Sequence, residues 1–155
     1  MDLFLSTFEN KLDRKGRLSV PASFRAVLER NKSPLFLYKS LTHSCLEGCG
    51  PERINQIVDA IDDMDALSEE AHTLQTMLSS AQEMRMDNEG RVMLSEDFIH
   101  YANLNEVALF AGIGRSFQIW NPAQWRLREA EARTNAKSGK MPKLTLGRQQ
   151  PQGAG

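Results

Sequence analysis

Residues 11–20 read KLDRKGRLSV and residues 85–94 read RMDNEGRVML, so the chain contains one short motif twice. Slot by slot the copies agree: a basic residue, an apolar residue, Asp, two variable residues, Gly, Arg, an apolar residue, a spacer and another apolar residue. A repeat of this kind indicates a duplicated supersecondary unit, so we expect the two copies to complete a shared core. The same offset relates later apolar residues, namely Phe24 to Phe98 and Leu35–Phe36 to Leu109–Phe110.

The composition bounds the class of protein. A chain of 155 residues with 41% hydrophobic residues can bury a core as one or two small domains. The formal net charge of -1 gives no overall attraction to nucleic acid, so an anion-binding site must come from local clustering of basic residues. The sequence shows neither a membrane span nor a signal segment, so we expect a cytoplasmic protein. Its two cysteines then read as reduced thiols.

The first copy predicts strands around one helix. Residues 4–12 mix apolar and polar residues. Residues 18–20 alternate between apolar and polar side chains, as a half-buried strand would. Pro21 suits the first position of a helix over residues 22–29, because its fixed φ fits there. A further strand is expected over residues 34–40.

The second copy predicts the same order of elements. Ser95 is a good N-cap for the corresponding helix. Strands are expected over residues 106–111 and 116–120, with a Gly-rich turn between them. Asn121–Pro122 then predicts the cap and first turn of a terminal helix.

Apolar residues at helical spacing after Pro51 indicate a helical hairpin between the two copies. From Thr134 onward the chain holds Lys, Gly, Gln and Pro with no acidic residue, which is typical of a disordered, mildly basic extension. We therefore expect a first repeat over 1–50, a helical linker over 51–81, a second repeat with its terminal helix over 82–133, and a disordered tail over 134–155.

The Asp and the Gly of each motif have a structural logic. An Asp side chain can accept backbone N–H groups of the turn that it starts, and Gly adopts a positive φ that other residues resist. Arg17 and Arg91 follow on a stiff loop, and the sequence leaves open whether they clamp the Asp or contact a ligand. The residues to which we assign the structural role are Asp13, Gly16, Asp87 and Gly90.

The two variable slots of the motif differ between the copies. The first copy places Arg14 and Lys15 there, and Lys11 and Arg25 lie close to them in the sequence. No turn geometry requires Arg14 or Lys15, so contact with an anionic ligand is favoured for both. The second copy carries Asn88–Glu89 instead and is near neutral. The sequence therefore predicts a phosphate-binding turn in the first copy.

With these residues the chain resembles the MraZ family of bacterial transcriptional regulators. The resemblance rests on the doubled Asp-x-x-x-Arg motif, on DRKGRLSVPA over residues 13–22 with Phe24–Arg25, and on FQIW over residues 117–120. It implies an α+β, β-rich fold of two tandem AbrB-like (SpoVT-AbrB) swapped-hairpin β-barrel units with flanking helices, assembled into a ring-shaped homo-oligomer. It also implies nucleoid-associated binding to short tandem repeats in the promoter of the division and cell-wall gene cluster, usually with repression.

The resemblance places the DNA-facing loop on Arg14, Lys15 and Arg17, and Arg91 matches it in the second motif. Arg14 or Arg17 can bridge guanine O6 and N7, whereas Lys15 suits a phosphate. One such turn neutralises few phosphates, so a ring would gain affinity by multivalency. Our full set of expected DNA-binding residues is Arg14, Lys15, Arg17, Lys11, Arg91 and Arg85.

Two departures from the family pattern accompany the resemblance. The second copy carries Glu89 and Ser95 where the first has Lys15 and Pro21, which puts equal DNA contact by both halves in question. Residues 45–49 are also more polar and Gly-rich than is usual for a strand at this place.

A protein-interaction module is the alternative from a different class. AbrB-like folds also occur in antitoxins, where an extended tail wraps a toxin enzyme. The apolar residues of this tail that could serve as anchors are Met141, Leu144 and Leu146. An antitoxin should also need only one hairpin unit per chain, whereas this chain has two copies.

No enzyme and no cofactor are expected. No Ser/His/Asp or Cys/His grouping has the context of a nucleophile. Gly112-x-Gly114 lacks the third glycine of a dinucleotide fingerprint and reads as a turn. His43, Cys45 and Cys49 fit no familiar zinc spacing, so we expect no metal.

Overall fold

The computed structural model describes residues 2–146 of the chain, which divides into two compact units between Trp125 and Arg126. The elements of the first repeat are β1 (Thr7–Lys11), β2 (Arg17–Ser19), α1 (Ala22–Arg30), β3 (Leu35–Lys39) and β4 (Leu46–Cys49), and the helical linker that follows holds α2 (Pro51–Asp62) and α3 (Glu69–Ser79). Those of the second are β5 (Gln82–Met84), β6 (Arg91–Met93), α4 (Glu96–Tyr101), β7 (Val107–Gly112), β8 (Phe117–Trp120) and α5 (Pro122–Asn135), followed by a π-helical turn (Ala136–Lys140).

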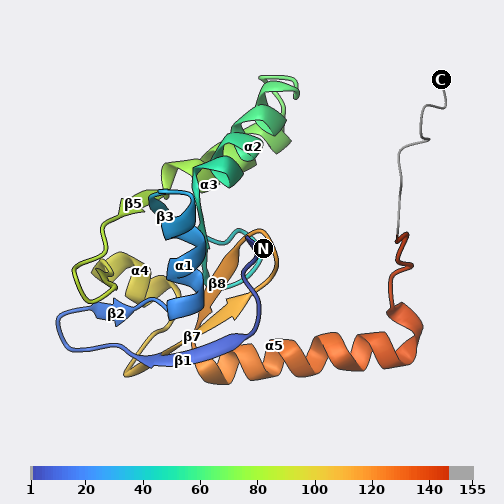
Figure 1. Cartoon of the computed structure of the whole chain (residues 1–155). Helices are drawn as coiled ribbons and strands as arrows, with labels where there is room; N and C mark the ends of the chain where they lie inside the picture. Colours follow the sequence, from blue (N-terminus) through green and yellow to red (C-terminus); the bar gives the residue numbers. More distant parts are fainter. Residues whose placement is uncertain (1, 147–155) are drawn as a thin grey trace. The chain divides into compact units, whose positions relative to one another are not determined.

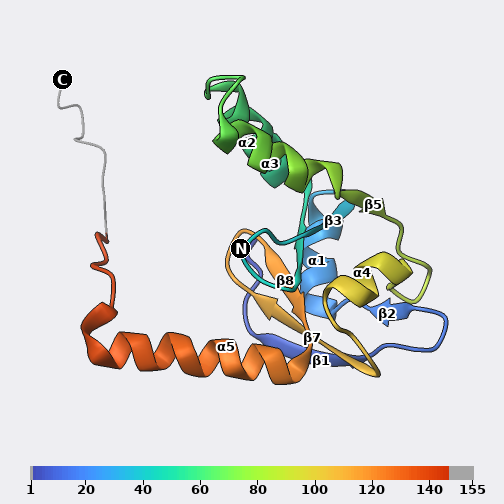
Figure 2. The same cartoon turned by 180° about the vertical axis from the view of Figure 1, so that it is seen from behind.

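The main sheet interleaves the two repeats (Figures 1 and 2). Its six strands are antiparallel and follow the order β1-β7-β8-β4-β3-β5. Two hairpins, β7–β8 and β4–β3, therefore lie at the centre. The outer strand β1, from the first repeat, pairs with β7 of the second, and the outer strand β5, from the second repeat, pairs with β3 of the first. The sequence expectation that the two copies complete one core is confirmed by this order.

The centre of the sheet lies between β4 and β8. Glu47 pairs with Gln118, and Leu46 and Gly48 pair with Ile119 and Phe117 on either side. The Nε2 of Gln118 donates to both carboxylate oxygens of Glu47, at 3.3 and 3.2 Å. The strands β4 and β8, which are equivalent in the two repeats, therefore pair with each other at the centre of the sheet, as expected of a duplicated unit.

The two repeated motifs meet in a second, two-stranded sheet, which we call the ribbon. In it β2 and β6 are antiparallel, with Leu18 opposite Val92. Two further backbone bonds extend the pairing: the Val20 N–H donates to the Gly90 carbonyl at 3.0 Å, and the Leu94 N–H donates to the Gly16 carbonyl at 2.8 Å. Each repeat therefore supplies one strand and one turn of the ribbon.

Aromatic rings fill the core between the sheet and α1. Phe24 on α1 is 1% exposed. Its ring centroid lies 5.0 Å from that of Phe117 and 5.2 Å from that of Phe4. The ring centroid of Phe110, from the second repeat, lies 6.2 Å from that of Phe24. Since Phe4 and Phe24 come from one repeat and Phe110 and Phe117 from the other, neither half holds this core alone.

The α+β, strand-rich class with tandem repeats and flanking helices is confirmed. The expected β-barrel units do not form a closed barrel, because β1 and β5 lie at opposite edges of the main sheet and do not pair with each other. One isolated bridge, between Leu12 and Leu18, links the start of the first turn to the ribbon. The strands form an open sheet with a separate ribbon.

The polar stretch after Cys45 is nevertheless a central strand, β4. A Cβ atom at Gly48 would lie within 2.8 Å of the ring of Phe117, so only glycine lets this ring pack against the strand. Cys45 and Cys49 are both fully buried, and burial raises the pKa of each thiol to about 12. Both cysteines are therefore inert residues of the core.

The helical linker forms the expected hairpin of α2 and α3, which lie side by side in both views (Figures 1 and 2). Of the residues in these two helices, Ala71 alone is buried. No helix within residues 2–146 is long and apolar enough to cross a membrane.

The terminal helix α5 has the expected cap, since the Oδ1 of Asn121 accepts from the N–H groups of Ala123 and Gln124 at 2.9 and 3.2 Å. The helix continues through Asn135, so the first two residues of the expected tail are helical, whereas Ser138 and Gly139 in the turn that follows have non-helical backbone angles. Residues 147–155 of that tail lie outside the described residues.

Candidate nucleic-acid interface

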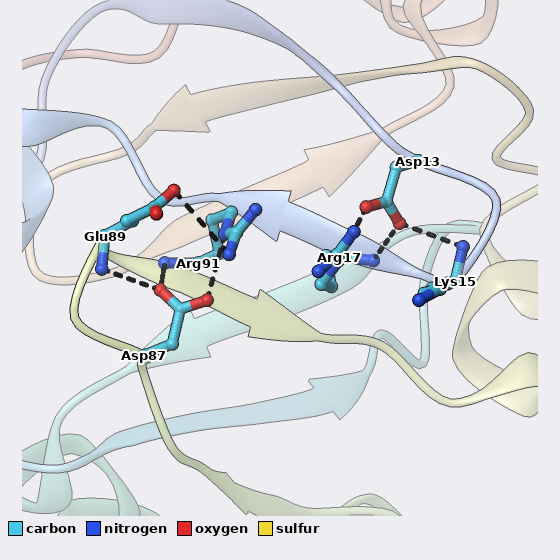
Figure 3. A network of polar contacts seen from close by, with 6 residues as sticks. All are labelled: Asp13, Lys15, Arg17, Asp87, Glu89 and Arg91. Atoms are coloured by element: carbon cyan, nitrogen blue, oxygen red, sulfur yellow. Dashed lines mark hydrogen bonds and ion pairs between the residues drawn. The ribbon is translucent and has the colours of Figure 1, made fainter.

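The first turn of the ribbon, residues 13–17, is built around the carboxylate of Asp13 (Figure 3). Its Oδ1 accepts from the backbone N–H groups of Lys15 and Arg17, at 2.9 and 2.8 Å. Its Oδ2 accepts from the Nε of Arg17 at 2.6 Å. The backbone of Asp13 closes the turn, because its carbonyl accepts from the Gly16 N–H at 3.0 Å.

The second turn, residues 87–91, repeats this geometry. Asp87 Oδ1 accepts from the N–H groups of Glu89 and Arg91, at 2.8 and 3.0 Å, and Oδ2 accepts from the Nε of Arg91 at 2.9 Å. The Gly90 N–H donates to the Asp87 carbonyl at 3.0 Å. The geometry fits the expected structural role of the Asp and Gly residues, and both Arg side chains clamp their own turn.

These bonds make the stability of the turns depend on pH. The backbone N–H of Arg17 foremost, with the Arg17 side chain and the N–H of Lys15, lowers the pKa of Asp13 below its usual 3.8. The N–H groups and side chain of the second turn likewise lower the pKa of Asp87, the Arg91 N–H foremost. A lowered folded-state pKa stabilises the fold above the unfolded pKa, and this contribution is lost as the pH falls through the folded value.

We therefore expect the double variant Asp13→Asn/Asp87→Asn to be less stable than the natural protein at pH 7. The difference in unfolding free energy should begin to shrink as the pH falls through the unfolded-state pKa of about 4, and should go on shrinking until the folded carboxylates are protonated, below their lowered pKa. Urea unfolding at several pH values between 7 and 3 measures this difference. A difference that stays constant across that range would contradict the role of the ionised carboxylates.

Each turn also needs its glycine. Gly16 has a φ of +86°, and a Cβ atom there would lie 2.8 Å from the carbonyl oxygen of Leu94. We expect Gly16→Ala to lose about 1–2 kcal/mol through the left-handed backbone, and more through the displaced carbonyl. Gly114→Ala is the matched control, because Gly114 has a φ of +106° with nothing within 4 Å of its Cβ position. Equal losses in thermal unfolding would show that the contact with Leu94 is unimportant.

Side chains of the ribbon divide between two faces. Leu18 and Val92 are buried, at 0% and 1% exposed, and point to the core. Alternation along each strand places the other residues on the opposite side, which we call the outer face of the ribbon. The members of the outer face are Arg17, Ser19, Arg91 and Met93. Two half-buried arginines thus lie on the outer face of the ribbon, and each is bonded to the Asp of its own turn (Figure 3).

The two ends of the ribbon differ in charge. Arg14 and Lys15 are exposed at the first turn, and among the described residues neither side chain has a hydrogen bond or an ion pair. Glu89 occupies the slot of Lys15 in the second turn, where its Oε2 lies 3.6 Å from Nη2 of Arg91. Arg91 therefore faces two carboxylates, which raise its pKa, the Asp87 hydrogen bond foremost. The first turn offers unpaired positive charge, and the second turn is partly neutralised.

One basic residue of the first repeat, Arg25, lies at the second turn of the ribbon and not at the first. Arg25 lies close to the first turn in the sequence. Its Nε instead donates to the Val20 carbonyl at 3.1 Å, and its side chain lies against Gly90 of the second turn. The antiparallel pairing causes this, since it places the end of β2 beside the start of β6.

The remaining expected basic residues lie at the ends of the outer strands. Lys11 is the exposed last residue of β1, and Arg85 is exposed directly after β5. Neither is linked to the ribbon by a hydrogen bond or an ion pair within residues 2–146. Residues 2–146 contain no cluster of three or more His, Cys, Asp and Glu side chains that could hold a metal ion.

Comparison with known proteins supports the duplicated architecture. Two consecutive segments of the chain, residues 3–76 and 77–144, each match the family described as "MraZ protein, putative antitoxin-like". The chain belongs to the MraZ family. The first MraZ segment contains β1 to β4 and the second contains β5 to β8, and both segments contribute strands to the main sheet.

Several curated MraZ proteins resemble the chain over most of its length. The chain is similar to the transcriptional regulator MraZ of Pelagibacter ubique, with 38% identity over 86% of this chain and 88% of that protein. The MraZ regulators of Rhodospirillum rubrum and Gluconobacter oxydans are 40% and 37% identical, over 79% and 89% of this chain and 81% and 87% of theirs. These relatives are named as regulators of transcription, which supports that role for a member of the MraZ family.

Two members of the outer face were not expected from the sequence. Ser19 and Met93 each occupy the spacer slot of the motif, and Met93 is 59% exposed beside Arg17. Strand alternation could have indicated both residues, because they lie two positions from the motif Arg.

Proposed function

We propose that this chain is a sequence-specific DNA-binding regulator of transcription that contacts double-stranded DNA through the ribbon. The observation that carries the proposal is the first turn, where exposed Arg14 and Lys15 stand beside the rigid Arg17 without a carboxylate of their own. Asp13 is engaged with Arg17 and with the backbone of the turn, so it holds the loop rather than neutralising Arg14 or Lys15. The names of the relatives support the regulatory role.

A two-stranded ribbon suits the major groove of DNA. B-DNA admits such a ribbon there, where each base pair presents a distinct pattern of donors and acceptors. Arg14 keeps all of its guanidinium donors and is the residue we assign to guanine. Arg17 commits its Nε to Asp13, which leaves its Nη groups for a base or a phosphate. Lys15 contacts phosphate as a point charge.

Affinity from one turn is small, so we propose that several copies act together in a ring. A few phosphate contacts give weak, salt-sensitive binding, and linking several contacts makes the later ones intramolecular. The hairpin of α2 and α3 supports self-association, because its apolar residues other than Ala71 are at best half-buried and Leu67, between the two helices, is 85% exposed. Light scattering on the purified chain measures the number of copies, and a monomer at all concentrations would contradict this step.

The regulated DNA is the promoter of the protein's own gene cluster for division and cell-wall synthesis, with repression as the outcome. Short tandem repeats would place successive copies of the ribbon at regular spacing along the groove. This role places the chain in the cytoplasm, at the nucleoid.

Footprinting of the DNA upstream of its own gene tests the proposed function. We expect protection of a short repeated sequence at near-physiological salt, and lower expression of a reporter placed behind that DNA. Protection of no segment, or equal protection of unrelated DNA, would contradict sequence-specific regulation.

The second candidate function is an antitoxin-like interaction module. Three exposed apolar residues in the second compact unit favour it: Met141, Leu144 and Leu146 are 62%, 66% and 79% exposed. A chain that co-purifies with an enzyme through residues 134–146, and does not protect DNA, would establish this role instead.

A further inference from the structure

We propose that Arg25 is a further DNA-binding residue and that its guanidinium binds a backbone phosphate of DNA at the second end of the ribbon. This inference rests on the proposed function, because it names a second contact of the same interface. The contact is composite: Arg25 belongs to the first repeat, and the turn beside it to the second.

The backbone of the ribbon fixes the position of Arg25. Its Nε donates to the Val20 carbonyl at 3.1 Å, and the N–H of Val20 donates to the Gly90 carbonyl at 3.0 Å. Both bonds lie at the point where β2 ends and the second turn leads into β6. The guanidinium is therefore held at the second end of the ribbon.

Gly90 makes room for this side chain. A Cβ atom at Gly90 would lie 2.6 Å from Cδ and 2.7 Å from Cζ of Arg25, so any other residue would displace it. The side chain of Arg25 is half-buried against the turn and is held there by the bond from its Nε to the Val20 carbonyl. An arginine ordered in advance loses little conformational entropy when it binds an anion.

Arg25 has no ion-pair partner within residues 2–146, in contrast to the other arginines of the ribbon. Arg17 is paired with Asp13 at 2.6 Å, and Arg91 with Asp87 at 2.9 Å. The Nε of Arg25 is engaged by a neutral carbonyl, which leaves its charge uncompensated and its Nη donors available. Paired N–H donors of a guanidinium match the oxygens of a phosphate.

The second repeat shows that packing does not require a charge at this position. At the same offset the residue is Ile99, whose Cδ1 lies 3.5 Å from the Cβ position of Gly16. Ile99 therefore covers the first turn as Arg25 covers the second. Because an aliphatic side chain fills this place in one repeat, the charge of Arg25 serves another purpose.

The assignment gives the two ends of the ribbon different tasks. The first turn reads bases through Arg14, and the second end holds the backbone through Arg25 without reading sequence. A ribbon with unlike ends binds DNA in one orientation, which suits direct repeats, whereas equal ends would suit palindromes.

Arg25→Ile is the decisive variant, because it copies the residue of the other repeat. Anisotropy titrations would use a duplex from the region upstream of the gene and a scrambled duplex, each at several salt concentrations. We expect the affinity for both duplexes to fall by a similar factor, about 3- to 10-fold, so that their ratio is unchanged. The slope of log K against log salt should become shallower by about 0.9 for each engaged copy.

Arg25→Lys separates charge from structure. We expect it to restore most of the salt slope, although an ammonium group lacks the planar guanidinium, whose Nε can donate to the Val20 carbonyl while its Nη groups donate to a phosphate. Natural affinity and slope in Arg25→Ile would overturn the inference and leave the proposed function standing. Weaker binding by both variants with an unchanged slope would show a structural role only and would also overturn it. A natural protein that binds neither duplex would overturn the proposed function and this inference with it.

Discussion

The variant Arg14→Glu/Lys15→Glu is expected to bind the DNA upstream of its gene about 100-fold more weakly than the natural protein, or worse. A lost guanine contact costs about 1–3 kcal/mol, and reversal of both charges adds repulsion from the phosphates. In an oligomer the loss is repeated in every copy. Fluorescence anisotropy at near-physiological salt measures the effect.

The fold should tolerate this variant, because the chain already carries Glu89 in the equivalent slot of the second turn. Lys137→Glu/Lys140→Glu is the matched control, since it makes the same change of charge at two exposed lysines of the second compact unit. We expect the control to bind nearly as the natural protein does. Equal losses in both variants would mean that only general electrostatic attraction acts.

Phe24→Ala is expected to destabilise the fold by about 3–5 kcal/mol, the usual range for removing a buried Phe. Phe24 is 1% exposed and packs against rings from both repeats, including Phe4 and Phe117. The cavity would therefore weaken the whole interleaved sheet. Urea unfolding followed by circular dichroism and by tryptophan fluorescence measures the loss.

Both signals should change together in Phe24→Ala, in one transition at lower urea. The fluorescence reports on Trp120 and Trp125, which lie in the second repeat, whereas the substitution lies in the first. Two separate transitions, with the tryptophan signal unmoved, would contradict a shared core.

Local patterns predicted the elements well, because they depend on neighbours in the sequence. The Asp turns, the Ser95 cap and the helical hairpin follow from short-range hydrogen bonds and helical spacing. The equivalence of the two motifs predicted that the repeats share a core, but not which strands pair.

Pairing over long distances could not be read from the sequence. The bond from Val20 to Gly90 and the bond from Leu94 to Gly16 each join residues of different repeats, and no local preference selects them. For the same reason Arg25 could be placed on a helix but not assigned to the correct turn. The open sheet differs from the expected barrels because nothing in β1 or β5 dictates whether these short strands meet.

Titration of the natural protein with the upstream duplex and with a scrambled duplex, at low and at near-physiological salt, tests the central claim most directly. The account predicts tight binding to the upstream duplex that survives near-physiological salt, and weak binding to the scrambled duplex that does not. Equal binding to both duplexes that disappears with salt would reduce the ribbon to a general basic patch and contradict the proposed function.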